Sequence, residues 1–174
     1  MKYLVKFFVV TMLFFVCTNV SAEQKIAYLD LKFVLNNSKA GEGVQNYLKK
    51  TFKESQDKFS KTESELKKDE KELLSKRQIM EQEDYKKKVD ELRKKVISHQ
   101  SQRRKVLEKI AGQRADAKKK LLNKLNPILQ TYAEENGISL VLNKNNVVMG
   151  KNEFDITETI VKKLNKELPS LKLN

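Results

Sequence analysis

The sequence contains one cysteine, one histidine and no tryptophan among its 174 residues, together with only five glycines and two prolines. Because the only cysteine, Cys17, lies in an apolar N-terminal stretch, the rest of the chain cannot hold disulfides, thiolate metal sites or a cysteine nucleophile. A lone histidine, His99, excludes a multi-histidine metal site. The glycines form neither a G-x-x-x-x-G-K-S/T phosphate loop nor a G-x-G-x-x-G fingerprint, and H-E-x-x-H and G-x-S-x-G are absent. We therefore expect no enzyme activity, no ATP-driven mechanism, no metal and no cofactor.

The charge of the chain is concentrated in its middle. Residues 49–124 contain 25 basic and 14 acidic residues, a net charge of +11, whereas the flanking residues after position 22 contain nine of each. Charged residues make up 34% of the whole sequence. This composition argues against one compact core and favours an elongated, solvated chain with a basic middle segment.

Residues 1–22 have the layout of a secretory signal peptide, with two lysines, an uncharged run at residues 7–16 and small residues at the end. We expect cleavage between Ala22 and Glu23, which exports the rest of the chain. Ten apolar residues cover half of the roughly 20 that a membrane-spanning helix needs, which disfavours a membrane anchor. Lipid attachment at Cys17 is an alternative that the bulky valine before it disfavours.

Residues 48–125 are expected to form a helical-hairpin arm. They lack proline, contain one glycine and are rich in good helix formers. Seam positions recur every 3.5 residues on average, as in a coiled coil. They are Leu48, Phe52, Ser55, Phe59, Thr62, Leu66, Asp69 and Leu73, and then Tyr85, Val89, Leu92, Val96, His99, Arg103, Val106, Ile110, Gln113 and Ala117.

The repeat loses its phase at residues 76–84, which predicts a turn at the tip of the arm. Folding back lets each helix bury its apolar stripe against the other, in an antiparallel arm roughly 40 to 60 Å long. Phe59 should then lie across from the region of His99. Ser55 should face the region of Arg103.

Six of the seam positions carry polar residues where a stable coiled coil would have leucine or isoleucine. These are Ser55, Thr62, Asp69, His99, Arg103 and Gln113. Together they predict a pliable arm, although any single one is equally a tolerated defect in a solvated hairpin.

Residues 23–47 and 126–174 are expected to form a small body that contains β-strands, so that the fold class is α+β. Ile26–Asp30 is an apolar strand candidate, and Asn36–Ser38 is a turn or cap before the long helix. Pro127 should kink or restart the returning helix, and Gly137 should end it.

The C-terminal part of the body predicts a β-hairpin and a helix. The apolar segments Ile138–Leu142 and Val147–Met149 flank an asparagine-rich turn. Residues 155–158 have the spacing of a capping box, and Pro169 marks the end of the helix. The apolar face of this helix consists of Ile156, Ile160, Leu164 and Leu168.

Three short strands with exposed edges would be marginally stable in one chain, which favours an oligomer of unspecified size. A monomer whose last helix covers the sheet is the alternative.

The order of these segments resembles the Skp (OmpH) family of periplasmic chaperones. A KIAYLDLKFVL strand, a long charged hairpin, the segment ISLVLNKNNVVMG and a closing DITETIVKKLNKEL helix follow the predicted signal peptide. The resemblance covers the whole mature chain. It implies a homotrimer in which strands join in a central body and three arms enclose a cavity. It also implies an ATP-independent holdase in the periplasm, whose clients are unfolded outer-membrane proteins awaiting insertion.

The basic arm suggests how such clients would be held. Cations attract anionic groups within a screened range of about 8 to 10 Å, and the lysine and arginine stems add apolar contacts. Ile79 and Met80 are candidate contact residues at the tip, unless they close the turn. The basic candidates are Lys86, Lys87, Arg93, Arg103 and Arg104.

Two other functions fit a basic helical arm. Export argues against a nucleic-acid-binding coiled coil. An exported structural or adaptor protein that binds anionic lipid, lipopolysaccharide or other envelope components is the stronger alternative.

Overall fold

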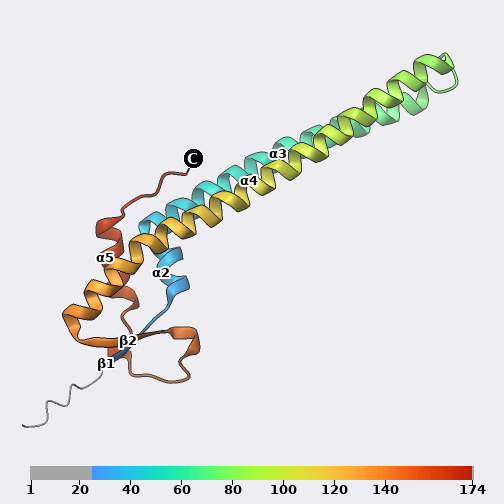
Figure 1. Ribbon diagram of the computed structural model, residues 1–174. Coiled ribbons are helices and arrows are strands. Elements are labelled where there is room, and N and C mark those ends of the chain that lie inside the picture. Colours follow the sequence, from blue (N-terminus) through green and yellow to red (C-terminus); the bar gives the residue numbers. More distant parts are fainter. Residues whose placement is uncertain (1–24, 174) are drawn as a thin grey trace, which may run out of the picture.

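The computed structural model describes residues 25–173. The predicted signal peptide and its expected cleavage site between Ala22 and Glu23 lie outside the described residues. Figure 1 shows a long pair of helices that projects from a small body, with the C-terminal segment running from the body to the base of these helices.

The arm consists of α3 (Lys39–Ser75) and α4 (Gln82–Asn136), which pack against each other in an antiparallel hairpin (Figure 1). At 1.5 Å per residue, α3 is about 55 Å long and α4 about 80 Å. The residues at positions 76–81 form the turn between them, so the expected helical hairpin is confirmed. Ser38 caps α3 as predicted, because its Oγ accepts a hydrogen bond from the Gly41 backbone N–H at 3.2 Å.

Pro127 lies inside one continuous helix α4, so of the two predicted outcomes, a kink or a restart, the restart is wrong. Leu125 and Ile128 on either side of this proline are 0% and 4% exposed, so body packing holds the helix together where a backbone hydrogen bond is missing. The predicted end is confirmed: Gly137 has a left-handed φ of 65°, and its N–H bonds the carbonyls of Ala133 and Glu134.

The body packs α2 (Leu31–Asn37) and α5 (Thr157–Glu167) against the base of α4 and a small sheet. Its core is a single apolar cluster to which every one of these elements contributes. The buried members are Ala27, Leu29, Val34, Leu125, Ile128, Ile156, Ile160 and Leu164. The predicted apolar face of α5 is therefore confirmed as core.

The sheet has two strands, β1 (Lys25–Leu29) and β2 (Ile138–Asn143), which pair in parallel. The predicted β-hairpin is wrong, because Lys144–Asn146 form a 3-10 turn and the segment after it does not return along β2. Val148 and Met149 are fully exposed there. The chain is thus mostly helical with a small parallel sheet, not a body of three strands.

The loop after β2 is fastened to β1 by polar contacts. The Tyr28 hydroxyl donates to the Lys151 carbonyl at 3.0 Å, and the Ile156 N–H donates to the Tyr28 carbonyl at 3.0 Å. Lys144 Nζ lies 2.6 Å from Asp155 Oδ2. Partial burial alone would raise the pKa of Asp155, but hydrogen bonds from Lys144 and Thr157 outweigh it and lower this pKa below its ordinary value.

Helix α5 begins at Thr157, and Asp155 Oδ1 accepts hydrogen bonds from the Thr157 N–H and hydroxyl. The Asp155 side chain thus bonds the backbone N–H two residues further on. In a capping box it would bond the N–H three residues further on. The helix ends at Glu167, just before Pro169.

Candidate functional site

The packing of the arm changes along its length. In α3 the buried residues lie between Ala40 and Leu48, at the base. In α4, His99 is the only buried residue on the tip side of Gln113. Because tightly packed apolar contacts supply most of the stability of a helical pair, the outer half of the arm is held together more weakly than the base.

A polar and aromatic cluster crosses the seam midway along the arm. The rings of Phe59 and His99 lie 5.5 Å apart, edge to face, which confirms the predicted pairing. Glu63 Oε1 lies 3.5 Å from His99 Nε2 and accepts a hydrogen bond from Arg103 Nη1 at 3.2 Å. Ser55 and Arg103 line the same hollow beside this cluster, as expected from the antiparallel register. The cluster fixes the register of the two helices where apolar contacts are few.

An open groove of about 560 Å³ runs between the helices on the tip side of this cluster. Apolar side chains and cations share its lining, and two carboxylates, Glu63 and Glu70, interrupt the positive charge. The apolar lining residues are Leu66, Val89, Leu92 and Val96, and the cations are Lys67, Arg93 and Arg103. Such a groove offers apolar contact and positive charge to the same ligand.

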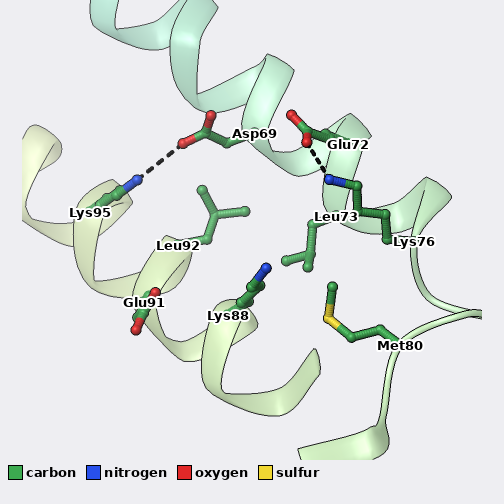
Figure 2. Close-up of a pocket in the computed structure, with 9 residues that line it drawn as sticks. All are labelled: Asp69, Glu72, Leu73, Lys76, Met80, Lys88, Glu91, Leu92 and Lys95. Carbon is green, nitrogen blue, oxygen red and sulfur yellow. Dashed lines mark hydrogen bonds and ion pairs between the residues drawn. The ribbon is translucent and has the colours of Figure 1, made fainter. Parts of the chain in front are cut away.

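A smaller hollow of about 180 Å³ lies near the tip (Figure 2). Figure 2 shows the Met80 side chain pointing from the turn toward Leu73, between the two helices. Two ion pairs border it: Lys95 Nζ lies 3.1 Å from Asp69 Oδ2, and Lys76 bonds Glu72. The hydrogen bond from Lys76 and its positive charge lower the pKa of Glu72.

Most of the positive charge on the arm is not neutralised within the chain. Among the described residues, five of the 25 basic residues of positions 49–124 form an ion pair with a carboxylate. They are Lys50, Lys76, Lys87, Lys95 and Arg103. The remaining cations are available to anionic groups outside the chain.

A family model described as outer membrane protein (OmpH-like) matches residues 25–164, which is most of the chain. The chain belongs to this OmpH-like family of outer-membrane chaperones. As a member of a family of chaperones, the protein is not an enzyme. The family predicted from the sequence is confirmed.

A crystal structure from Caulobacter crescentus CB15, described as an outer membrane chaperone (OmpH-like), has the same fold. Its TM-score is 0.79 at 17% sequence identity, with 87% of this chain and 89% of that chain covered. A comparison with curated proteins finds no match. Within residues 25–173, no helix is both long and apolar enough to cross a membrane.

The contact residues predicted for this OmpH-like arm do not gather at one place. Ile79 is 84% exposed in the turn, whereas Met80 is half-buried in the hollow near the tip. Arg93 and Arg103 line the open groove, although Arg103 also pairs with Glu63. The other basic candidates, Lys86, Lys87 and Arg104, are exposed on α4. The assignment of all seven to client contact stays a prediction.

Sequence reasoning missed that the groove leaves seam residues accessible. Val89 is 37% exposed although it holds a seam position. The signal that could have found this is the polar seam residues nearby, Asp69 and His99, because a polar side chain fills a seam position less well than leucine does.

Proposed function

We propose that this OmpH-like protein is an ATP-independent holdase of the periplasm, which keeps unfolded outer-membrane β-barrel proteins soluble before their insertion. The observation that carries the proposal is the outer arm, where a half-open apolar seam lies beside several cations. Lys67 and Arg93 form no ion pair with a carboxylate among the described residues, whereas Arg103 pairs with Glu63. Weak apolar contacts and screened positive charge suit a client with no fixed shape. Because each contact is weak and several arms act together, binding needs no energy source and remains reversible.

Assembly into a homotrimer belongs to the same proposal. The outer edge of β2 has no strand partner among the described residues, and apolar side chains are exposed around it. They include Ile26, Leu140, Leu142, Val148 and Met149, which are between 38% and 103% exposed. An open strand edge with apolar neighbours is a surface that native proteins cover, and closed symmetric association would cover it while bringing the arms around a basic cavity. Light scattering or analytical ultracentrifugation of residues 23–174 should give three times the chain mass.

The holdase activity can be tested by diluting a urea-unfolded β-barrel protein into buffer with increasing amounts of the mature protein. Turbidity should fall to background at about one trimer per client, because binding lowers the free concentration of the unfolded chain. No suppression at severalfold excess would instead favour the structural or adaptor function.

Two charge variants distinguish the effect of the arm charge on client binding from the effect of the body charge. The arm variant replaces Lys86, Lys87, Arg93 and Arg104 by glutamine, and its matched control replaces the exposed body residues Lys25, Lys32, Lys162 and Lys166. Both lose four positive charges, but only the arm variant should slow client association, by about tenfold or more at low salt. Equal effects in the two variants, or binding that is independent of salt, would contradict a role for the arm charge.

Anionic lipid and lipopolysaccharide are further proposed partners of the same cations. Vesicles of zwitterionic lipid with and without an anionic lipid, or with lipopolysaccharide, distinguish this binding from a nonspecific one. The arm variant should sediment less with the anionic vesicles than the body control does.

A further inference from the structure

The segment after α5 leaves the body and runs back along the base of the arm (Figure 1). Residues 168–173 have no regular secondary structure, and the family match ends at Leu164, before this segment. Leu171 and Leu173 are half-buried against Val44, Leu48 and Ala117, with Ile110 packed against the same cluster. Lys172 between the two leucines is exposed. We call residues 169–173 the tail, and the surface of Val44, Leu48, Ile110 and Ala117 the basal site.

The tail contacts the basal site through the side chains of Leu171 and Leu173. Residues 169–173 form no backbone–backbone hydrogen bond with the other described residues. In an extended chain, alternate side chains point the same way, so Leu171 and Leu173 can both face the basal site while Lys172 faces solvent. Any extended segment with large apolar residues at alternate positions would present the same pair of side chains.

We propose that the basal site binds extended polypeptide segments with apolar side chains at alternate positions, and that the tail occupies this site as a competitor from within the chain. The inference rests on the proposed holdase function, because the strands of an unfolded β-barrel protein alternate apolar and polar residues. Without a client, the tail keeps an apolar surface covered that would otherwise promote self-association. The tail is displaced easily, because the conformational entropy lost when it is ordered offsets much of the binding free energy that burial of the two leucines contributes.

The size of the effect follows from the occupancy of the tail. A ligand binds only the molecules in which the tail has left the basal site, so its apparent affinity is the intrinsic affinity multiplied by the fraction of such molecules. If the tail occupies the basal site in half to nine-tenths of the molecules, freeing the site raises ligand affinity about two- to tenfold.

The test uses mature protein and a fluorescent peptide with the sequence of residues 165–174, with binding followed by fluorescence anisotropy. The variant L171S/L173S frees the basal site, and K172S is the matched control because its side chain is exposed. The peptide should bind L171S/L173S two- to tenfold more tightly than it binds wild type or K172S. A peptide with serine at both leucine positions should not bind. Equal affinity for all three proteins, or no binding to any of them, overturns the proposal.

A second substitution locates the site. Val44→Thr keeps the shape of the side chain but adds a hydroxyl to the basal site, so in the L171S/L173S background it should weaken peptide binding severalfold. Unchanged binding would place the peptide elsewhere and refute the basal site. Circular dichroism of each variant verifies that α3 remains folded.

The client aggregation assay, run in parallel, separates this inference from the proposed function. If L171S/L173S suppresses client aggregation but binds no peptide, the basal site is refuted and the holdase function stands. If the peptide binds but no protein suppresses aggregation, the holdase function fails and the basal site remains a peptide site.

Discussion

Replacing Gly41 by alanine should destabilise the protein, although alanine is the better helix former. Gly41 is buried in the first turn of α3, where the chain passes close to α2. A Cβ at this position would lie 1.9 Å from the backbone oxygen of Leu35 and 2.9 Å from its carbonyl carbon. Because both atoms belong to the backbone, no side chain can rotate away, and α2 would have to move.

The magnitude follows from two opposing effects. In a helix, glycine to alanine gains about 1 kcal/mol. Overpacking a buried site costs about 1–3 kcal/mol, and more when backbone must shift, as it must here next to fully buried Val34. With a cost of about 3–4 kcal/mol for a clash that only a backbone shift relieves, Gly41→Ala should lower the free energy of unfolding by about 2–3 kcal/mol in total. Gly43, two residues further along α3, has nothing within 4 Å of the corresponding position, so Gly43→Ala should gain about 1 kcal/mol.

Urea unfolding followed by circular dichroism measures the free energy of unfolding of both variants. All proteins are compared at one concentration, because the proposed assembly would make stability concentration-dependent. The two midpoints should move in opposite directions from wild type. If Gly41→Ala proves as stable as Gly43→Ala, the close approach of α2 and α3 is not a feature of the folded protein.

Three further substitutions test the core, the loop and the tip. Ile160→Ala removes a fully buried core side chain and should lower the free energy of unfolding by about 2–5 kcal/mol in the same urea assay; a loss well under 1 kcal/mol would mean that α5 is not docked as described. The pKa of Asp155 is lowered by folding, so its stabilisation is present above its ordinary pKa of 3.8 and is lost as the pH falls below it. Asp155→Asn should therefore be less stable than wild type near neutral pH, and the difference in thermal unfolding temperature should shrink toward pH 3; a constant difference would contradict this linkage. Ile79→Ser should change stability by less than about 0.5 kcal/mol, because the side chain is 84% exposed, yet weaken client binding about threefold to fivefold in a titration with an unfolded β-barrel protein; unchanged binding would remove Ile79 from the contact residues.

The arm could be predicted because its signal is local and repeated. A 3.5-residue spacing maintained over many turns indicates two helices, and the loss of phase between them locates the turn closely enough to place Phe59 opposite His99. The spacing identifies which residues face the partner helix, but not how closely the helices pack. The groove that exposes Val89 could therefore not be read from it.

The body was predicted less well because its partners are far apart in the sequence. Ile138–Leu142 was predicted as a strand, and it forms most of β2, but its partner is decided by competition between a nearby apolar segment and distant β1. β2 pairs with β1 because this pairing buries Ala27–Leu29 of β1 in the body. Val148 and Met149 of the nearby segment are instead left exposed to solvent. The docking of the tail on the arm is missed for the same reason, since Leu171 and Leu173 contact residues more than fifty positions away.

The parallel pairing of β1 with β2 makes the whole arm the crossover connection between two neighbouring strands. Parallel strands require a long connection, and here that connection projects outward instead of covering the sheet. Both of its ends are fixed in the body, so its length is free to vary only if the outgoing and returning helices change together. Inserting one heptad in each helix would lengthen the arm by about 10 Å and leave the strand register intact. The reach of the arm is thus set independently of the body, because matched changes in the two helices leave the strand pairing and the core unchanged.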